Sequence, residues 1–456
     1  MSPRGRTRNS TVSAMRRAES GASRPDLVAA QSAGTGLLRR VWTWVHDGPL
    51  LHSYYALAAS AVLLSAVGVM MVLSSSSVES ISSDQSAYQY FWRQLVFGGG
   101  GIFAMVVLSL LPPKLFERCA VMAFAVTSLG LATVLLWGTE INGNRNWIQI
   151  GQFTAQPSEA AKLGVALMLG WYFAKYSRQL HGWGYLWPSG LILLVPLIGV
   201  GAGGDAGTAI IFVLIYAAAL FLAGAPLKLF AVGGLGALVI SAFTVVMAPH
   251  RMDRVTGWIT GNCDAAGSCW QAQQGLGALA TGGWWGVGLG QSRSKYSYVP
   301  EAHNDYIFAI IGEELGLIGT VFILALFAVM AVAMARVLLR SNSTFERITT
   351  GGILAWLIGQ AFVNIGMVTG ALPVIGVPLP FISYGGSSLF MCLAAVGVVM
   401  SFTRLAGPTW LDRLINRFRG PSARTTPSPA PEAAWDGETE LPHNVHRIGT
   451  RPERTS

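Results

Sequence analysis

Residues 298–316 read Tyr298-Val-Pro-Glu-Ala-His-Asn-Asp-Tyr-Ile-Phe-Ala-Ile-Ile-Gly-Glu-Glu-Leu-Gly316, and they pass from a polar loop into an apolar run that continues to Val337. A transmembrane helix needs about 20 mainly apolar residues, so a run of this length predicts a helix that crosses a bilayer. A charged side chain costs about 2.5–3.5 kcal/mol at the centre of a bilayer. The sequence keeps Asp305 at the start of the run and Glu313 and Glu314 inside it. Because these acids are costly to keep there, we expect at least one of them to have a function.

Similar apolar runs recur along the chain. Of its 456 residues, 52% are hydrophobic and 12% are charged, whereas a soluble domain carries about 25% charged residues. Four cysteines are too few for a disulfide scaffold. We therefore expect an all-α polytopic membrane protein of about ten transmembrane helices, with a large extracellular loop between helices 7 and 8. The apolar runs lie at about 54–74, 94–112, 117–137, 159–176, 187–201, 206–224, 227–248, 306–337, 350–370 and 385–403.

The basic residues orient these helices. The net charge is +9, and Lys and Arg gather in the tails and in alternate loops, which is typical of membrane topology and not of nucleic-acid binding. The loops rich in Lys and Arg are predicted to be cytoplasmic, and so are both termini. The opposite set of loops, predicted to lie outside the cell, comprises 75–93, 138–158, 202–205, 249–305 and 371–384.

Three regions follow from this pattern. Residues 1–50 are rich in Arg, Ser, Gly and Ala, which predicts a disordered cytoplasmic tail. Residues 51–404 form the membrane domain, and residues 405–456 form a second cytoplasmic tail. Apolar residues from Trp410 to Phe418 repeat at helical spacing between arginines, which predicts a short interfacial helix. The Pro-, Thr- and Ser-rich sequence after it is expected to be disordered.

The outer loop 138–158 leads into a helix whose first turn carries opposite charges. Pro157 is typical of a first helical turn, and Glu159 lies near the positive end of the helix dipole. Lys162 follows three residues later, so the two side chains can pair on one helical face. The pair either only orients the helix or, together with Arg145 of the loop, binds a pyrophosphate or sugar ligand. The spacing leaves both interpretations open.

Two further outer segments hold candidate ligand-binding groups. The glycine-rich run 282–290 is followed by Arg293 and Lys295, and two cations beside such a loop could hold an anion. The alternative is a solvated loop face. Asp205 stands before Ala206-Gly-Thr208 at the start of the sixth helix, where it either caps the helix or takes part in a site.

Asp305 lies where the large loop becomes the eighth helix, so it is either an N-cap acceptor or a functional acid. His303 is more often a structural hydrogen-bonding group than a base at such a place. At about 100° per residue, Glu313 lies about 80° around the helix from Asp305, and Glu314 lies on the opposite side. The two glutamates therefore cannot both face one site with Asp305, and at least one is expected to bond between helices.

The segment between the last two helices holds three prolines, which exclude a continuous helix and predict a re-entrant or packed outer loop. It reads Leu372-Pro-Val-Ile-Gly-Val-Pro-Leu-Pro-Phe-Ile-Ser-Tyr-Gly-Gly-Ser-Ser388. Ser383 and Tyr384 could donate hydrogen bonds to a ligand. Alternatively, the loop only packs against its neighbours.

Four motifs together resemble the SEDS family of shape, elongation, division and sporulation proteins, over about residues 54–404. They are Gln156-Pro-Ser-Glu-Ala-Ala-Lys162, Pro300-Glu-Ala-His-Asn-Asp305, Gly312-Glu-Glu-Leu-Gly316 and Gly376-Val-Pro-Leu-Pro-Phe-Ile-Ser-Tyr-Gly-Gly-Ser-Ser388. The end of the first helix and the long tails favour the division member of the family over the elongation member. Two departures stand out: Asn304 lies where the family commonly has Thr, and Asn146 lies before Trp147, where the family often has Arg.

The resemblance implies a peptidoglycan glycosyltransferase that polymerises lipid II into glycan strands on the outer face of the cytoplasmic membrane, at the division septum. It also implies a class B penicillin-binding protein, a transpeptidase, as the partner that crosslinks the strands, beside other division proteins. Asp305 matches the essential loop aspartate of the family.

The residues fit this chemistry. Because the diphosphate of lipid II is a good leaving group, the reaction needs a base for the acceptor hydroxyl and positive charge for the diphosphate, without a second carboxylic acid. We expect Asp305 to be the base. A divalent cation could share the charge, but the sequence shows no dedicated ligand cluster, so no cofactor is assigned. The substrate-binding candidates are Arg145, Lys162, Glu159, Arg293, Lys295, His303, Ser383 and Tyr384.

Other functions stay open from the sequence. A lipid II flippase or transporter would use the same charged cavity for passage, and a non-catalytic division scaffold would tolerate changes at Asp305 but not loss of its tails. An elongation-type polymerase is the alternative within the family.

Overall fold

A computed structural model describes residues 50–82, 86, 88–141, 144–151, 153–176, 186–246, 249–260, 268–293 and 303–404. All of them belong to the first of the two units into which the chain divides, Met1–Pro408. The predicted tails and the interfacial helix lie outside the described residues, apart from Leu50, and stay predictions.

Ten helices of the described part coincide with the ten predicted apolar runs, which confirms a polytopic helical membrane protein. They are α3 (Leu51–Ser82), α4 (Gln89–Leu110), α5 (Pro113–Trp137), α6 (Pro157–Tyr176), α7 (Leu186–Ala202), α8 (Ala206–Leu222), α9 (Leu227–Val246), α12 (Ile307–Arg340), α13 (Thr344–Val368) and α14 (Gly386–Phe402). Five of the helices, α3, α4, α5, α12 and α13, are long and apolar enough to cross a membrane. The shorter apolar helices are α7, α8, α14 and the first part of α9.

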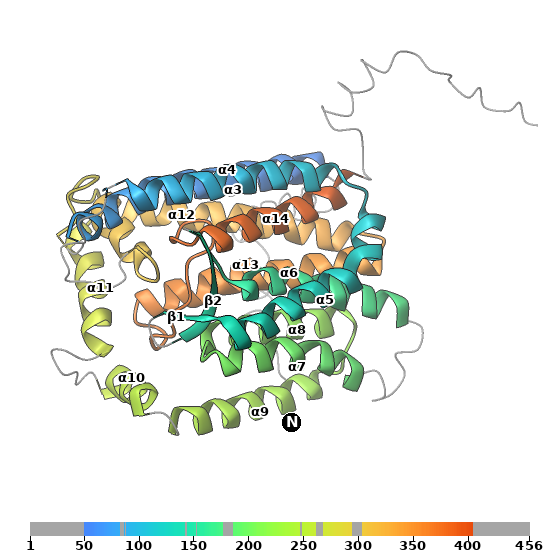
Figure 1. The fold of residues 1–456 in the computed structure, drawn as a ribbon. Helices are drawn as coiled ribbons and strands as arrows, with labels where there is room; N and C mark the ends of the chain where they lie inside the picture. Colours follow the sequence, from blue (N-terminus) through green and yellow to red (C-terminus); the bar gives the residue numbers. More distant parts are fainter. Residues whose placement is uncertain are drawn as a thin grey trace, which may run out of the picture. The chain divides into compact units, whose positions relative to one another are not determined.

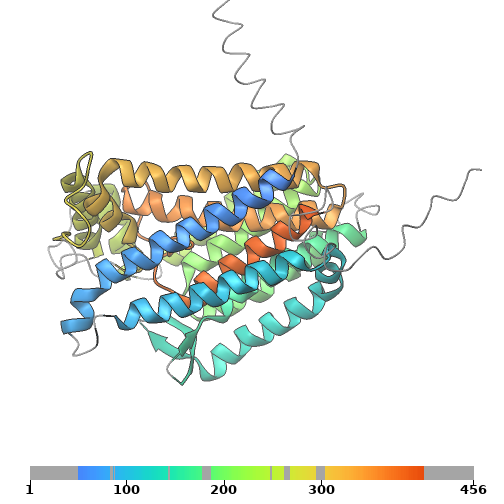
Figure 2. The same cartoon turned by 90° about the horizontal axis from the view of Figure 1, so that it is seen from above.

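The helices run alongside one another, as Figures 1 and 2 show from two directions. Helix α4 packs on α14, α3 on α12, and α8 on α13. The buried core is richest on α13 and α14, whose side chains are covered from several sides. Helix α9 lies at the edge of the bundle in Figure 1 and exposes most of its apolar side chains, including Leu227, Leu235 and Leu238.

The loops that the sequence predicts to lie outside the cell carry structure that the all-helical expectation did not include. Residues 139–155 form a three-stranded antiparallel sheet in the order β1-β2-β3, from β1 (Thr139–Ile141), β2 (Asn144–Ile150) and β3 (Phe153–Ala155). The large loop after α9 contains α10 (Pro249–Thr260) and α11 (Ser268–Gly282). The strands pair each other's backbone N–H and C=O groups in hydrogen bonds. The loop between α5 and α6 is therefore ordered.

Helix α12 is interrupted at Gly316, whose φ of 68° and ψ of −166° are not helical. The turn after α11 fills the interruption. Its amides at Val287 and Gly288 donate to the carbonyls of Glu313 and Glu314, at 2.9 and 3.1 Å. In return, the amides of Leu317 and Ile318 donate to Gly283 and Trp284, at 2.9 and 3.3 Å. The helix break therefore keeps its backbone hydrogen bonds, which a membrane protein requires.

Glycines let α4 and α14 approach closely. A Cβ at Gly101 would lie 2.7 Å from Leu393 Cδ1 and 3.2 Å from the backbone of Phe390, whereas a Cβ at Gly99 would meet nothing within 4 Å. Small residues at such interfaces allow backbones to pack tightly without a hydrophobic driving force.

We predict that Gly101→Ala destabilises the protein by about 1–3 kcal/mol, because the methyl group overpacks the interface between α4 and α14. The measurement is the apparent melting temperature of the purified protein in detergent. Gly99→Ala is the matched control on the same helix, and it should be neutral or stabilise by up to about 1 kcal/mol, since Ala favours the helix over Gly. Equal effects of the two substitutions would contradict the packing described here.

Candidate functional site

Asp305 lies in the turn 303–306, directly before α12. The N-cap residue of α12 is Tyr306, whose side chain makes no capping hydrogen bond. Asp305 precedes it by one residue and is not itself the N-cap residue. The side chain of Asp305 is half-buried. Its Oδ2 atom lies against Gly376, where an added Cβ would stand only 3.3 Å away.

The backbone of this turn is held at three consecutive carbonyls. The amide of Tyr384 donates to the carbonyl of His303 at 2.9 Å, and Ser383 Oγ donates to the carbonyl of Asn304 at 2.7 Å. The carbonyl of Asp305 accepts from Asn364 Nδ2 at 2.8 Å. The same Nδ2 donates to Val377 at 2.7 Å. The position of the Asp305 backbone is thus fixed by α13 and by the segment between α13 and α14.

That segment is non-helical from Pro373 to Gly385, as its three prolines predict. It is tied back on itself, because the amide of Leu379 donates to Ser383 Oγ at 2.7 Å. Ser383 and Tyr384 thus contact the turn that carries Asp305. Their observed contacts are with the protein itself, so any contact with a ligand remains a prediction.

His303 is buried in a group of aromatic rings. Its ring centroid lies 5.1 Å from that of Tyr90 on α4 and 5.6 Å from that of Tyr384. The rings of Tyr90 and Tyr384 are 4.8 Å apart at a steep angle, an edge-on arrangement that aromatic pairs favour. The three rings bring α4, the turn and the last loop together at one end of the bundle.

Glu159 and Lys162 form the ion pair that their spacing predicts, with 2.8 Å between Lys162 Nζ and Glu159 Oε2. The side chains of both are only 2% exposed. Lys162 Nζ also donates to Gln360 Oε1 at 3.1 Å and lies 5.1 Å from the centre of the Trp356 ring. The amide nitrogen of Gln360 donates to the carbonyl of Pro378 at 2.8 Å. The ion pair therefore connects, through Gln360, to the loop beside Asp305.

Asp205 is the N-cap of α8, which confirms the capping interpretation. It accepts hydrogen bonds from the amide and hydroxyl of Thr208 at 2.8 and 2.7 Å, and from Gln156 Nε2 at 3.3 Å. Burial raises the pKa of Asp205, although the hydrogen bonds from Thr208 and the charge of Lys162 act in the opposite direction.

Two of the remaining predicted cations, Arg145 and Arg293, are exposed. Arg145 is exposed on β2, and its guanidinium donates to the carbonyls of Gly138 and Leu136 at 2.9 and 3.3 Å, at the C-terminal end of α5. A cation at the C-terminal end of a helix interacts favourably with the helix dipole. Arg293 is exposed, and its amide donates to Glu313 Oε1 at 3.0 Å. Lys295 lies outside the described residues. Among the residues described, no three His, Cys, Asp or Glu side chains gather in a way that could hold a metal ion.

Both glutamates of α12 are buried and bind other segments. Ser74 Oγ on α3 donates to both carboxylate oxygens of Glu314, at 2.6 and 2.8 Å. Ser292 Oγ donates to Glu313 Oε2 at 2.6 Å. These bonds hold the turn after α11 and α3 to α12, so both glutamates connect structural segments.

Sequence reasoning missed Gln360 and Asn364. Both stand within an apolar run and are four residues apart, which places them on one face of α13. Isolated amides in a membrane helix at this spacing are a usable signal, because each needs a partner inside the protein.

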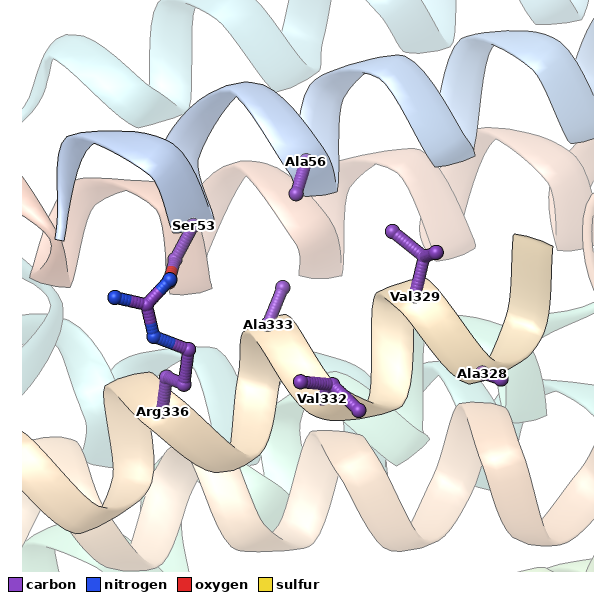
Figure 3. Close-up of a pocket in the computed structure, with 7 residues that line it drawn as sticks. All are labelled: Ser53, Ala56, Ala328, Val329, Val332, Ala333 and Arg336. Carbon is purple, nitrogen blue, oxygen red and sulfur yellow. The ribbon is translucent and has the colours of Figure 1, made fainter. Parts of the chain in front are cut away.

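The cavity in Figure 3 is remote from this region. It has a volume of about 260 Å³ and is lined by aliphatic side chains of α3 and α12 with Ser53 and Arg336 at one end. Arg336 is 31 residues from Asp305 along the chain, roughly 45 Å at 1.5 Å per residue. A second cavity of about 310 Å³ lies between α5 and α6. We therefore place the candidate site at the Asp305 turn and not in these cavities.

The sequence model of a protein family described as cell cycle proteins, which covers FtsW, RodA and SpoVE, matches residues 55–406. A probable peptidoglycan glycosyltransferase FtsW of Mycobacterium tuberculosis is 37% identical over 374 residues, which is 80% of this chain and 70% of the relative. Stage V sporulation protein E of Bacillus subtilis is 35% identical over 349 residues, covering 75% of this chain and 94% of the relative.

Two solved structures are similar in fold. One is a peptidoglycan synthase complex, described as coordinating polymerisation and crosslinking. It matches with a TM-score of 0.65 and 27% identity, covering 78% of this chain and 98% of the other. The rod shape determining protein RodA of Thermus thermophilus matches with a TM-score of 0.57 and 25% identity, covering 77% of this chain and 97% of the other.

We predict that Lys162→Met destabilises the protein by about 3–5 kcal/mol, because it leaves the carboxylate of Glu159 buried without its counter-charge. The double variant Lys162→Met/Glu159→Gln should recover most of the loss. Apparent melting temperatures in detergent measure both effects. Lys175→Met is the control at the other end of α6: Lys175 is exposed and lies 4.7 Å from the centre of the Trp171 ring, so the change should stay within about 1 kcal/mol. Wild-type stability of Lys162→Met would exclude a structural role of the pair.

Proposed function

Because the chain belongs to the family of FtsW, RodA and SpoVE cell cycle proteins, we propose that it is a peptidoglycan glycosyltransferase that polymerises lipid II during cell division. The similarity to proteins named as probable peptidoglycan glycosyltransferases supports the activity. The similarity to the FtsW members, at up to 37% identity, supports the division role over the elongation role of RodA.

The arrangement of Asp305 is the single observation that carries the mechanism. Its backbone carbonyl and those of His303 and Asn304 are each hydrogen bonded to another segment. As a residue, Asp305 is only half-buried. A rigidly placed acid that a substrate can reach is what general base catalysis requires.

In the proposed reaction, the Asp305 carboxylate takes the proton from the 4-hydroxyl of the acceptor sugar. The acceptor oxygen then forms a bond to the anomeric carbon of the donor, while the bond from that carbon to the diphosphate oxygen breaks. The lipid diphosphate leaves as an anion, and attack from the opposite face gives a β-1,4 linkage. No second carboxylic acid is needed, since diphosphate departs without protonation.

Positive charge on the protein would stabilise the departing diphosphate. Arg145 and Arg293 are exposed, so they can meet a substrate directly. Lys162 is buried beneath the loop beside Asp305, and its charge acts there through the ion-pair network with Glu159. Lys295 completes the cationic set, and a divalent cation could share its role. His303, Ser383 and Tyr384 complete the proposed substrate-binding group beside the base.

The proposal includes an assembly and a location. A class B penicillin-binding protein would crosslink the strands that this protein makes, and the similarity to a synthase complex that coordinates polymerisation with crosslinking supports such a partner. The basic loops support a cytoplasmic position for both termini in the inner cell membrane. Asp305 would then face the outside, at the division septum, together with other division proteins.

We predict that Asp305→Asn lowers the rate of glycan synthesis from purified lipid II by about 10²–10⁴-fold, because the amide cannot accept the proton. The assay follows polymer length on a gel, with and without the partner transpeptidase. Glu117→Gln is the control, since Glu117 lies near the start of α5, at the end of that helix opposite the strands that carry Arg145, and it should retain the rate.

Polymer synthesis by a folded Asp305→Asn protein would contradict the assignment of the base. Transfer of labelled lipid II across liposomes without glycan product would instead indicate a flippase. Depletion of the protein from cells should give filaments or failed septa, whereas rounding or loss of polar growth would indicate the elongation role.

We predict that Asn364→Leu lowers kcat by about tenfold to a hundredfold and changes KM little, because the Asp305 and Val377 carbonyls lose their shared donor and the base shifts. Single-variant kinetics with lipid II measure the effect. Thr369→Val on the same helix is the control, since its hydroxyl donates to helix carbonyls of Ile365 and Gly366. A loss confined to KM would show that Asn364 does not position the base.

A further inference from the structure

The turn after α11 presents two tryptophans to the surroundings. Trp284 is 69% exposed and Trp285 is 81% exposed. Val287 and Leu289, in the same turn, are 45% and 52% exposed. We call residues 284–289 the tryptophan tip. Exposed apolar residues this concentrated mark a surface that meets a membrane or a protein.

The tip has a fixed position on α12. Its backbone makes three of the four hydrogen bonds that complete the break at Gly316, and the preceding residue, Gly283, accepts the fourth. Two glycines make the contact close, since a Cβ at Gly286 would lie 2.2 Å from the Glu314 carbonyl oxygen, and a Cβ at Gly316 would lie 2.4 Å from the Gly286 nitrogen. The two tryptophans are therefore attached rigidly to a membrane-spanning helix at a defined height.

The length of α12 gives the level of the tip relative to the two boundaries of the membrane. Arg336 and Arg340 lie near the C-terminal end of the helix; Arg336 is buried and Arg340 is partly exposed, and cations at helix ends mark one membrane boundary. Gly316 is 20 residues before Arg336 and 24 residues before Arg340, so it lies about 30–36 Å away, which matches or slightly exceeds the thickness of the hydrocarbon core. The tip is thus at the level of the opposite boundary.

The surface of α12 next to the tip agrees with this placement. Leu317, Ile318, Val321 and Phe322 lie directly on the Arg336 side of the break, and each is between 45% and 52% exposed. Such a row of exposed apolar side chains on a spanning helix faces lipid chains. The tip begins where this row ends, because the amide of Ile318 bonds to the carbonyl of Trp284.

We propose that the tryptophan tip inserts into the interfacial layer of the bilayer at the end of α12 opposite Arg336 and Arg340. Tryptophan is enriched at this depth because its ring favours the upper acyl chains while its N–H reaches the polar layer. Arg293, exposed just after the tip, can extend its guanidinium to lipid phosphates. Under the orientation proposed above, this is the outer leaflet. The inference does not depend on the glycosyltransferase activity.

Fluorescence quenching in vesicles tests the insertion. The wild-type protein and the Trp284→Phe/Trp285→Phe variant are both reconstituted into phosphatidylcholine vesicles. The fluorescence emission of Trp284 and Trp285 is obtained by subtracting the spectrum of the variant from that of the wild-type protein. We expect phosphatidylcholine brominated near the top of its acyl chains to lower this difference emission at least about twofold. Bromine at the chain ends and iodide in the water should each quench less.

Matched variants keep the test decisive. The single variants Trp284→Phe and Trp285→Phe each give a partial difference spectrum if the double variant does not fold. Trp356, which is fully buried, supplies the control through Trp356→Phe, and its difference emission should respond to none of the quenchers. Quenching of the tip by iodide but not by brominated lipid would overturn the proposal, because it would show that the tip is exposed to water. Protection from both quenchers only when a partner protein is added would overturn it in favour of a protein interface.

Discussion

The candidate site depends on donors for the backbone carbonyls of residues 303–305. A buried carbonyl that lacks a donor costs free energy, so an irregular turn packed inside the protein persists only where other segments supply hydrogen bonds. Asn364, Ser383 and the amide of Tyr384 supply them. The proline-containing segment before α14 is therefore part of the site's construction, because its irregular backbone frees groups that a helix would use internally.

Helix α13 connects two polar regions that are far apart in the sequence. Gln360 accepts from Lys162, which is paired with Glu159 on α6. One turn along the same face, Asn364 holds the Asp305 carbonyl. The buried ion pair and the Asp305 turn thus share one rigid support. A shift of α6 relative to α13 would displace the Asp305 turn through Gln360 and Asn364, since packed helices move as units and not by continuous deformation.

The sequence was sufficient for features set by local chemistry. Apolar runs located most helix ends to within about five residues, although α3 ends eight residues later and α13 begins six residues earlier than predicted. Pro157 located the start of α6, and the spacing of Glu159 and Lys162 predicted the ion pair. The roles of Gln360 and Asn364 were not predictable, because an isolated amide in an apolar helix can face any neighbour. The break at Gly316 was also hidden, since its missing bonds are supplied by residues about 30 positions earlier. Short strands in the outer loop carried no clear alternating pattern.

The interruption of α12 also bears on how the protein responds to membrane thickness. A spanning helix tilts when the hydrocarbon layer thins, and an unbroken rod would carry that tilt to its far end. In α12 the turn after α11 bonds to both sides of Gly316, to Glu313 and Glu314 before it and to Leu317 and Ile318 after it. A tilt of the long segment is therefore carried through this turn to the segment that begins after Asp305, which couples the geometry around Asp305 to the thickness of the bilayer.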